Sequence, residues 1–406
     1  MSVRTVLVNL PQPELKQPSA YIPLGLAYLG TALKHCGINV KVLDLAGYSE
    51  GWEDKLKEIQ ADWVGLSCLS STYPITIKVS KWLKENTKAK IVVGGVHATI
   101  CPHETLRDTG ADYVIQGEGD YAFPNLILGG YANPPQIIDG GIVFNLDHLG
   151  YPARELFSNE AVVDVSGIHG QEKGVKATSI IMSRGCPYNC AFCCKGHPMF
   201  KVPRFRSPIE VANELKMLEL VYGVQHIRFV DDTFTLEKLR VLLLCNLLKV
   251  SKSDLTWVCI TRADRTDREM LQAMAGAGCT EVHIGVETGS PELLKTMNKG
   301  ETVEQYLDTA EKAHGAGLRV KTYIMYGFPG ETDHDRELTV KLLEKIRPDK
   351  VTISRFTPIP GCHVWLNPQR YGLSYVDVHT NEQWFYPDEK DAGWLDFKAK
   401  IEQICQ

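Results

Sequence analysis

Three cysteines with C-x3-C-x2-C spacing are the strongest chemical signal in this 406-residue sequence. Cys186, Cys190 and Cys193 follow directly after a run that is predicted to form a strand. Three thiolates can bind a four-iron cluster and leave one iron without a protein ligand. The spacing therefore predicts an open [4Fe-4S] cluster in a loop at the carboxyl end of a strand.

A structural zinc ion is the alternative for this cysteine segment. It would need a fourth ligand, which Cys194 or His197 could supply. The position of the loop at the end of a strand favours a reactive site instead, and Cys194 then lies outside the motif. We interpret the eight cysteines that stand singly as small buried apolar residues: Cys36, Cys68, Cys101, Cys245, Cys259, Cys279, Cys362 and Cys405.

The composition is that of a folded, water-soluble chain. Hydrophobic residues make up 44% and charged residues 23%, which excludes collagenous, disordered and membrane-embedded classes. No apolar run is long enough to span a bilayer, and the amino-terminal segment lacks the apolar core of a signal peptide. We therefore expect a cytoplasmic protein. The net charge of -5 gives no electrostatic reason to expect a nucleic-acid partner.

The elements before the cysteine segment predict a doubly wound, Rossmann-like α/β domain over residues 1–128. Short β-branched runs alternate with amphipathic helical stretches, which is typical of a parallel sheet with crossover helices. Ligands of such sheets bind outside the carboxyl ends of the strands. The predicted strands are Arg4–Asn9, Asn39–Asp44, Trp63–Ser67, Lys90–Gly94 and Tyr113–Gln116.

The rest of the chain predicts a linker, a partial barrel and a tail. Residues 129–175 are rich in Gly and Pro without a hydrophobic period, so we expect a linker. Residues 176–357 contain six strand–helix units, too few for a full eight-fold barrel, which predicts a partial (β/α)6 TIM-type barrel. Residues 358–406 are expected to form a small tail. The predicted barrel strands are Thr178–Met182, His226–Val230, Thr256–Arg262, Glu281–Gly285, Arg319–Met325 and Lys350–Phe356.

The cysteine segment resembles that of the radical S-adenosylmethionine (radical SAM) superfamily, whose open iron chelates the amino and carboxylate groups of S-adenosylmethionine. The resemblance implies that Cys186, Cys190 and Cys193 are the cluster ligands and that Phe192 lies against the adenine. Further family positions fall at the ends of barrel strands. They imply cofactor contacts for Asp231 (ammonium), Arg262 (carboxylate), Glu287 (the cofactor-binding acid) and Gly327 (close backbone approach). An aspartate cap with a turn, a surface ion pair and a plain glycine turn are the structural alternatives at Asp231, Arg262 and Gly327.

The first domain resembles the cobalamin-binding domain that is fused to some radical SAM enzymes. The resemblance rests on Ile22–Leu29, Asp62–Ser67, Gly94–Thr99 and Gly117–Gly119 in this order. In such domains the nucleotide tail of cobalamin is threaded between the sheet and its helices, past small residues. The resemblance therefore implies cobalamin contacts at Ser67, Ser70, Ser71, Gly94, Gly95, His97, Gly117 and Glu118. Each segment taken alone also suits an ordinary tight strand end.

The motif D-x-H-x-x-G, whose histidine ligates cobalt in cobalamin-dependent mutases and methionine synthase, is missing after the first strand. Residues 10–22 contain no histidine, and Asp377–His379 lacks the glycine. The resemblance thus implies base-off cobalamin without a histidine ligand, as is usual in the radical SAM subgroup. We interpret His97 as a pocket or capping residue.

The implied activity is methyl transfer to an unactivated carbon or a phosphinate phosphorus. In the family a 5'-deoxyadenosyl radical abstracts a hydrogen atom from the substrate, and the substrate radical attacks methylcobalamin. Enzymes that rearrange, oxidise or deoxygenate substrates share these motifs and remain alternatives. We expect a small-molecule substrate or biosynthetic intermediate, a flavodoxin- or ferredoxin-type reductant, and a pocket lined in part by Thr357–Trp365.

Two other classes of protein remain as alternatives. A methylthiotransferase would carry a second cluster on three cysteines of the first domain. Cys68 and Cys101 suit that plan, but no third cysteine follows the first strand, since Cys36 ends the first helix. A cobalamin or redox sensor without catalysis would leave the cofactor contacts at the strand ends without a use.

Overall fold

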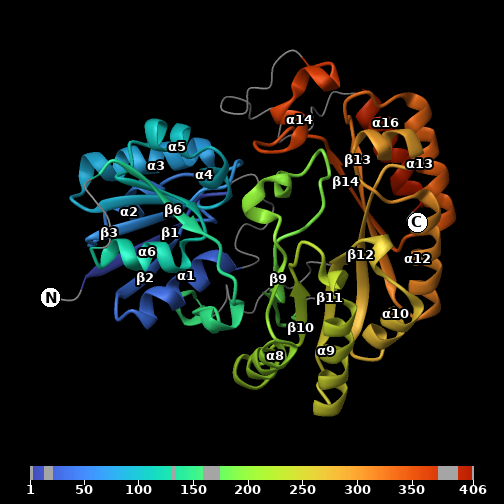
Figure 1. Ribbon diagram of the computed structural model, residues 1–406, viewed down its shortest axis with the longest axis horizontal. Coiled ribbons are helices and arrows are strands. Elements are labelled where there is room, and N and C mark those ends of the chain that lie inside the picture. Colours follow the sequence, from blue (N-terminus) through green and yellow to red (C-terminus); the bar gives the residue numbers. More distant parts are fainter. Residues whose placement is uncertain (1–2, 13–21, 130–133, 159–173, 374–391, 405–406) are drawn as a thin grey trace. The chain divides into compact units, whose positions relative to one another are not determined.

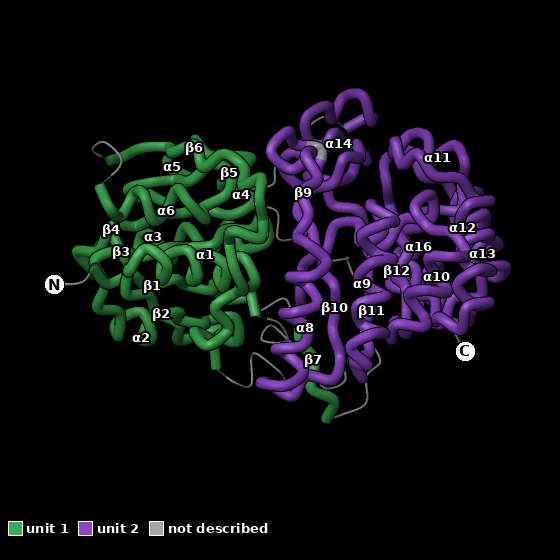
Figure 2. Tube along the Cα trace, turned by 60° about the horizontal axis from the view of Figure 1, so that its bottom comes forward, with its two compact units in different colours: residues 1–178 green, residues 179–406 purple. Residues whose placement is uncertain are grey.

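The computed structural model describes residues 3–12, 22–129, 134–158, 174–373 and 392–404. The chain divides into two compact units, Met1–Thr178 and Ser179–Gln406 (Figure 2). Each unit is built on a six-stranded sheet (Figure 1). No helix in the described ranges is long and apolar enough to cross a membrane. The predicted boundaries of the linker and tail stay predictions.

The first unit is doubly wound, as predicted. Its strand order is β2-β1-β3-β4-β5-β6, and the register pairs are parallel. The strands are β1 Arg4–Asn9, β2 Asn39–Asp44, β3 Trp63–Ser67, β4 Lys90–Gly94, β5 Tyr113–Gly117 and β6 Gln136–Gly141. The helices are α1 Leu24–His35, α2 Trp52–Leu56, α3 Tyr73–Asn86, α4 Val96–Ile100, α5 Pro102–Thr109 and α6 Gly119–Ile127. The strand order reverses between β1 and β3, the position where such sheets bind ligands.

The sixth strand, β6, differs from the sequence prediction, which had only five strands here. Ile137 and Ile138 pair with Val114 and Ile115 of β5. β6 has only two apolar residues, Ile137 and Ile138, followed by an aspartate and a pair of glycines, so it carries no detectable period of its own. Pairing with β5, rather than local propensity, makes this segment a strand.

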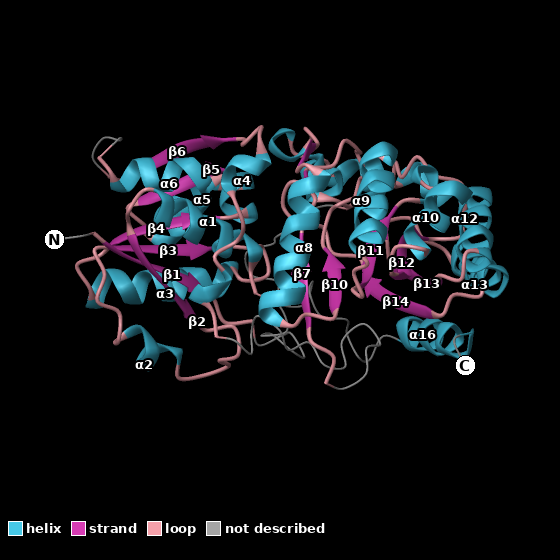
Figure 3. Ribbon diagram, turned by 90° about the horizontal axis from the view of Figure 1, so that it is seen from below, coloured by secondary structure: helices cyan, strands magenta, loops and turns pink. Residues whose placement is uncertain are grey.

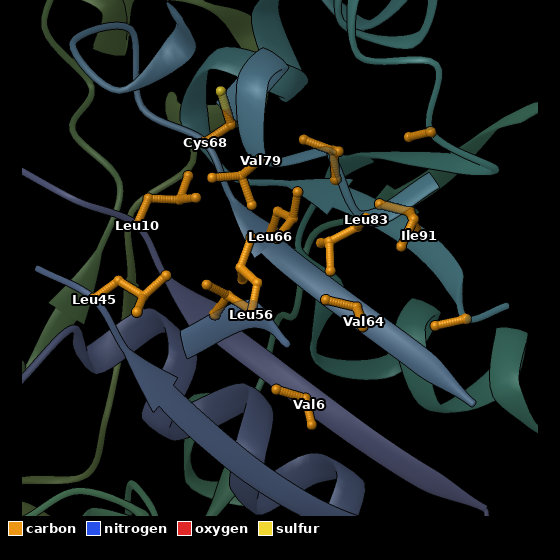
Figure 4. Close-up of a cluster of buried hydrophobic side chains, with 14 of the residues drawn as sticks. Val6, Leu10, Leu45, Leu56, Val64, Leu66, Cys68, Val79, Leu83 and Ile91 are labelled. Carbon is orange, nitrogen blue, oxygen red and sulfur yellow. The ribbon is translucent and has the colours of Figure 1, made fainter. Parts of the chain in front are cut away.

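Apolar side chains cover both faces of the first sheet. On one face, residues of β1, β3 and β4 pack against α2 and α3; Figure 4 shows Val64 and Leu66 beside Val79 and Leu83. On the other face α1 and α6 are neighbours. Gly65 of β3 lets α6 approach closely, since a Cβ there would lie 2.9 Å from the Phe123 ring. This packing holds the carboxyl ends of the strands in fixed positions.

The second unit is an open, partial barrel, as predicted. Its strand order, β14-β13-β12-β11-β10-β7, follows the chain, with β7 and β14 at the two edges. The strands are β7 Ala177–Ile180, β10 His226–Phe229, β11 Thr256–Thr261, β12 Cys279–Glu287, β13 Arg319–Tyr326 and β14 Lys350–Arg355. A small antiparallel pair, β8 Ser183–Arg184 and β9 Arg204–Phe205, stands apart from this sheet.

Helices of this unit lie along the barrel sheet (Figure 3). They are α8 Pro208–Tyr222, α9 Lys238–Ser251, α10 Arg268–Ala275, α11 Pro291–Thr296, α12 Val303–Gly315 and α13 Asp333–Ile346. In the sequence, Ser207-Pro208-Ile209-Glu210 and Thr266-Asp267-Arg268-Glu269 predict helix starts that are capped by Ser207 and Thr266. Ser207 does cap α8, with Pro208 in its first turn. The cap of α10 lies one residue later than predicted, because the Asp267 carboxylate accepts the hydrogen bond from the Met270 N–H.

The described parts of the tail pack on the barrel. α14 His363–Leu366 lies near the cysteine loop, where Val364 belongs to an apolar cluster with Ala191 and Phe328. α16 Ala392–Ile404 packs on α13, and the rings of Trp394 and Phe397 lie 5.4 and 5.7 Å from the Tyr326 ring. The tail therefore contributes both to the wall of the barrel and to the surroundings of the cysteines. The triplet Asp377–His379 and Cys405 lie outside the described residues.

Candidate functional site

The β8–β9 pair closes the loop that carries the three cysteines. Gly185 has a φ of +94°, and a Cβ there would lie 2.5 Å from the carbonyl oxygen of Val202. Only glycine fits so close an approach. The Cys186 N–H then donates to the Phe200 carbonyl at 2.8 Å. The first cysteine is therefore anchored by the backbone on both sides of the loop.

The middle of the loop is held by two segments from far along the chain. The Ala191 N–H donates to the Met297 carbonyl at 2.7 Å, and the Ala191 carbonyl accepts from the Val364 N–H at 3.1 Å. Asn298 Nδ2 also donates to the Asn189 carbonyl at 2.9 Å. Cys186, Cys190 and Cys193 are each half-buried in this frame. The loop is thus positioned by the barrel and by the first part of the tail.

Two cations stand beside Cys190. Arg262 Nη1 lies 3.9 Å from its sulfur. Burial raises the pKa of the Cys190 thiol, and the charges of Lys299 and Arg262 oppose that rise. Because a metal-bound thiol is deprotonated, nearby cations favour the bound form.

The three thiols fit an iron–sulfur cluster. Among the residues that the structure describes, no group of three or more His, Cys, Asp or Glu side chains converges on one metal ion. A mononuclear zinc site needs such convergence, whereas each protein-bound iron of a four-iron cluster takes its own thiolate. A half-buried loop with spaced cysteines and adjacent cations has the donor chemistry that such a cluster requires.

Glu287 has a strained backbone at the end of β12. Its φ is +64°, and the pairing of β12 with β13 shifts register between Gly285 and Glu287. Such irregularities re-aim a side chain and are common at functional sites. Lys299 Nζ lies 3.2 Å from Glu287 Oε1 and 5.8 Å from the centre of the Phe192 ring. The structure thus brings together two predicted cofactor contacts from distant parts of the chain.

A glycine makes room for this group. A Cβ on Gly285 would lie 2.6 Å from Glu287 Oε1 and 3.0 Å from Lys299 Nζ. A side chain at this position would displace the ion pair. The sequence analysis placed Gly285 only as the end of a strand.

Sequence reasoning missed Lys299 and Glu301. Both are buried, and their charged groups lie 3.4 Å apart. Glu301 Oε1 also accepts from the Ala263 N–H at 2.6 Å. A Lys-Gly-Glu triplet after a short helix looks like a solvated turn, and only burial distinguishes it. The triplet links the end of β12 to the loop after β11.

Arg262 is buried and bound within the protein. Its Nε donates to Asp264 Oδ1 at 2.9 Å, and its Nη2 donates to the Lys299 carbonyl at 2.9 Å. The guanidinium also lies 3.6 Å from the centre of the Tyr188 ring. The surface ion pair considered as an alternative is wrong, since Arg262 is only 6% exposed. Arg262 positions the cysteine loop, and its contact with the cofactor carboxylate stays a prediction.

Asp231 ties the end of β10 to the start of the cysteine segment. Its carboxylate accepts hydrogen bonds from the Met182 N–H at 3.0 Å and from the Ser183 hydroxyl. The residue is 2% exposed, and burial raises its pKa to about 6. It caps no helix in this arrangement, because the next helical turn is preceded by Thr233. Its contact with the cofactor ammonium stays a prediction.

Gly327 lies in a tight turn on the wall of a cavity of about 330 Å³. Its φ is +78°, and its N–H donates to Glu331 Oε2 at 2.7 Å. The cavity is also lined by Phe328, Pro329 and Arg336. The backbone at Gly327 is therefore accessible to a ligand, as the predicted role requires.

A second cavity, of about 320 Å³, lies beside the cysteines. Cys190 and Cys193 line it together with Asn298, and the tail contributes Gly361 and His363. The His363 Nδ1 atom lies 2.9 Å from the Tyr371 hydroxyl, which fixes the ring. Part of the predicted pocket segment Thr357–Trp365 thus lies next to the cluster loop.

In the first unit, the loops after β3 and β4 are bonded to each other. Gly95 has a φ of +101°, and a Cβ there would lie 2.7 Å from the Cys68 carbonyl oxygen. The same carbonyl accepts from the His97 N–H at 3.1 Å. The adjacent Gly94, which pairs with Ser67 across the strands, is different: a Cβ there would meet only Ile115, at 4.0 Å. Gly94 therefore leaves open space at the strand end.

His97 fastens these loops. It is 1% exposed, its ring is stacked on the Tyr73 ring at 4.0 Å, and its Nδ1 lies 3.1 Å from Ser70 Oγ. These contacts are with side chains, and the interpretation of His97 as a pocket or capping residue stays a prediction. The remaining predicted contacts of this unit differ in their surroundings, with Ser71 exposed and Ser67 half-buried.

Gly117 and Glu118 follow β5 at the same edge. The Gly117 N–H donates to the Thr99 hydroxyl at 3.1 Å. The Glu118 carboxylate accepts from the Val143 N–H, and its own N–H donates to the Gly141 carbonyl at 3.0 Å. Glu118 therefore binds the chain that leaves β6, and its role toward a cofactor stays a prediction.

The cysteines of the first unit do not resemble cluster ligands. Cys68 and Cys101 are both buried, and burial raises the pKa of each thiol to about 12. Cys36 is exposed at the end of α1. The interpretation as buried apolar residues is confirmed for Cys68 and Cys101 and is wrong for Cys36, because the end of α1 leaves its side chain exposed.

Comparison with protein families gives two matches. The model described as the radical SAM superfamily matches residues 180–343, which include the cysteine loop and the strands from β10 to β13. The model described as the B12 binding domain matches residues 16–127. Each match falls within one of the two units.

Similar proteins extend over most of the chain. An uncharacterized methyltransferase of Pyrococcus horikoshii is 30% identical over 390 residues, covering 90% of this chain and 83% of the relative. A cytidylyl-2-hydroxyethylphosphonate methyltransferase of Streptomyces wedmorensis is 24% identical, covering 88% and 79%. Among solved structures, the radical S-adenosylmethionine methyltransferase TsrM from Kitasatospora setae, with cobalamin and a [4Fe-4S] cluster bound, superposes with a TM-score of 0.71 at 20% identity, covering 93% of this chain and 76% of that one.

Proposed function

Because the chain belongs to the radical SAM enzymes that carry a B12 binding domain, we propose that it is a methyltransferase acting on an unactivated carbon or a phosphinate phosphorus. The observation that carries the proposal is the similarity to a methyltransferase across both units, over 90% of the chain. An open-cluster loop and a cobalamin unit in one chain supply the two parts that such a reaction needs. Centres of this kind lack a usable lone pair for ordinary methyl transfer.

The residues of this chain would hold the cofactors and exclude water. Cys186, Cys190 and Cys193 would bind the cluster, and Glu287 and Phe192 would contact S-adenosylmethionine. When bound, the cofactors supply the radical and the methyl group. Arg262 and Asp231 keep the loop in place, so that the reacting groups are held in line.

We infer base-off cobalamin without a histidine ligand. The support is the environment of His97, which is buried against Tyr73 and Ser70. In the described part of the first unit, the other histidines are His35 in α1, His103 in α5 and His148 in a short helical turn. Burial and hydrogen bonding of His97 make it a positioning residue for the loop after β4.

A second candidate function is oxidation or rearrangement without methyl transfer. An anaerobic magnesium-protoporphyrin IX monomethyl ester cyclase of Cereibacter sphaeroides is 25% identical, covering 83% of this chain and 59% of the relative. Its name describes a ring-forming reaction. Because of this similarity, the experiment below also tests the second candidate function.

The test uses anaerobically reconstituted enzyme, a low-potential reductant, small-molecule extract of the source cells and S-adenosylmethionine deuterated in its methyl group. Methyl transfer predicts a product that gains an intact CD3 group. Two S-adenosylmethionine molecules are consumed, one as methyl donor and one as radical source, so S-adenosylhomocysteine and 5'-deoxyadenosine should form in about equal amounts. Extract-dependent 5'-deoxyadenosine without labelled product or S-adenosylhomocysteine would favour the second candidate.

A matched pair of variants assigns the activity to the site. Glu287→Ala should reduce 5'-deoxyadenosine formation more than cobalamin binding. Glu292→Ala, which removes an exposed acid of α11, should leave both unchanged. Equal effects of the two changes would contradict the role of Glu287.

A further inference from the structure

A cluster of cations lies on one face of the barrel strands. Register pairs place Glu281 beside Arg319 and His283 beside Lys321, and Lys321 beside Lys350. Neighbours in register on parallel strands point to the same face. On β13 the alternate residues, such as Val320 and Thr322, are fully buried, whereas Arg319, Lys321 and Tyr323 are half-buried. We call Arg228, Glu281, His283, Arg319, Lys321, Tyr323 and Lys350 the inner cluster.

The inner cluster faces the same side as the cofactor residues. Gly285 follows His283 by two residues on β12, so both point to one face. A Cβ on Gly285 would touch Glu287 and Lys299. The inner cluster therefore continues the face that carries the candidate site, toward the start of the strands.

Glu281 is the single carboxylate of the inner cluster, and it is already bound. Its Oε1 accepts from His283 Nε2 at 2.8 Å, and its Oε2 lies 3.4 Å from both Arg319 Nε and Lys350 Nζ. Burial raises its pKa, but His283, Lys350 and Arg319 outweigh this and lower it to about 2. The charge of Glu281 is thus shared among three groups.

Lys321 differs from the other cations of the inner cluster. In the part of the chain that the structure describes it has no ion pair or hydrogen bond, and its Nζ lies 5.1 Å from the centre of the Tyr323 ring. Burial lowers the pKa of Lys321; the charge of Glu281 opposes this shift, and repulsion from Arg228 and Lys350 adds to it. The described side chains of the inner cluster include four cations (Arg228, Arg319, Lys321 and Lys350) and one carboxylate (Glu281), so together they carry an excess of positive charge. Half-buried charge of one sign is costly unless an anion offsets it.

We propose that Lys321, together with Arg228 and Tyr323, binds a compact anionic group of the substrate, a carboxylate or a phosphate. This deepens the proposed function and rests on it. A neutral acceptor could form a hydrogen bond with the ammonium but would leave its charge unbalanced, whereas an anion forms the hydrogen bond and also offsets the charge. The Tyr323 hydroxyl lies 3.3 Å from His283 Nδ1, which orients it in the cluster.

The placement also sets a length for the substrate. Lys321 pairs with His283, four residues before Glu287. At roughly 3.3 Å per residue this is about 13 Å along the strand. The anionic group would therefore be bound about one small-molecule length from the end of β12 that carries Glu287, so that binding energy away from the reaction orients the substrate.

The test measures anion binding by cluster-reconstituted protein. Thermal unfolding is followed in sodium phosphate, sodium acetate and sodium chloride at matched ionic strength. A bound anion stabilises the native state according to its concentration relative to its dissociation constant. Phosphate or acetate should raise the midpoint of the wild-type protein above that in chloride, and the more effective of the two identifies the group. Lys321→Gln should lose this increment, and Lys321→Arg should keep most of it.

The matched control is Lys341→Gln, which removes an exposed lysine of α13 with the same change of charge. It should keep the wild-type increment. Equal increments in Lys321→Gln and wild type would overturn the proposal. So would the absence of any increment in the wild type.

A separate measurement distinguishes failure of this proposal from failure of the proposed function. Cleavage of S-adenosylmethionine to 5'-deoxyadenosine in the absence of substrate should be the same in wild type, Lys321→Gln and Lys341→Gln. An anion increment without any cleavage would leave the anion site standing and count against the radical reaction. Cleavage lost only in Lys321→Gln would mean that Lys321 acts at the cofactor, and it would overturn the assignment to substrate.

Discussion

The ammonium nitrogen of Lys299 lies 3.2 Å from Oε1 of Glu287, and this pair joins the irregular end of β12 to the chain after α11. Lys299 is 6% exposed and also lies 3.4 Å from Glu301. Lys299 therefore pairs with two carboxylates within the site, and Arg262 Nη1 also lies 3.5 Å from the second of them, Glu301. Because Arg262 donates to the carbonyl of Lys299, the pair is connected to the cysteine loop as well.

Lys299→Met should destabilise the second unit by about 3 kcal/mol, because removing one partner of a buried ion pair leaves the other charge unpaired. Lys295→Met is the control, since Lys295 is 73% exposed in its pair with Glu292. A surface pair contributes about 0–1 kcal/mol. Urea unfolding followed by circular dichroism measures both. Similar losses for the two variants would show that the Lys299 pair does not stabilise the fold.

Replacing Cys186, Cys190 and Cys193 together with Ala should remove the iron from anaerobically reconstituted protein, which should otherwise hold about four irons and four sulfides. Cys194→Ala is the control and should keep them, because Cys194 lies outside the motif. Iron and sulfide analysis with absorbance spectroscopy checks both variants. Cluster retained in the triple variant would refute the ligand set.

Gly94→Trp should abolish cobalamin binding while leaving the iron content and the fold intact, because a side chain at Gly94 enters open space rather than backbone. Gly95→Ala provides the contrast. It combines a φ of +101° with a contact of 2.7 Å to the Cys68 carbonyl, so it should destabilise the first unit by about 1–3 kcal/mol. Cobalamin titration and thermal unfolding separate the two effects. Undiminished cobalamin binding by Gly94→Trp would exclude this path for the nucleotide tail.

The electron spin resonance spectrum of the cob(II)alamin form should lack nitrogen superhyperfine splitting, in wild type and in His97→Gln alike. The reason is that His97 is buried and bonded to Ser70. Splitting in the wild type that disappears in His97→Gln would identify His97 as the cobalt ligand. Splitting that persists in the variant would indicate another nitrogen, and either result contradicts the base-off model.

His226 should make the second unit lose stability in acid. Burial lowers its pKa from 6.5 to about 4, so the unfolded chain takes up a proton at a higher pH than the folded one. The stability is complete above pH 6.5 and falls as the pH drops toward 4, by about 3 kcal/mol. His226→Gln should lack this part of the pH dependence. Urea unfolding midpoints of both proteins are measured from pH 7 to 4 and subtracted. Because Asp231, whose raised pKa makes the opposite contribution, is present in both proteins, its effect cancels in the difference. Parallel pH profiles would contradict the assignment.

Local signals in the sequence were sufficient to predict the helices and strands that have a clear hydrophobic period or capping residues of their own. The first five strands of unit 1 and the six barrel strands were predicted within a few residues, since each has a β-branched run bounded by turn residues. β6 was not, because its two isoleucines become a strand only by pairing with β5. The α10 cap was misplaced by one residue, because both Thr266 and Asp267 can cap and only the geometry selects Asp267.

The cluster loop could be predicted from the sequence because the three cysteines that are expected to bind one cluster are close in the chain, and their spacing carries the information. The side chains that surround the loop could not be predicted from the sequence. Arg262 and Glu287 lie at the ends of β11 and β12, and Lys299 meets them from the chain after α11. Ala191 is held by backbone from Met297 and Val364. Lys321 looks like any surface lysine until the register of β12, β13 and β14 places it among other cations. Charges that are distant in sequence influence one another only when folding brings them together and removes water, so the tertiary structure alone decided which side chains pair, which remain unpaired and where the site lies.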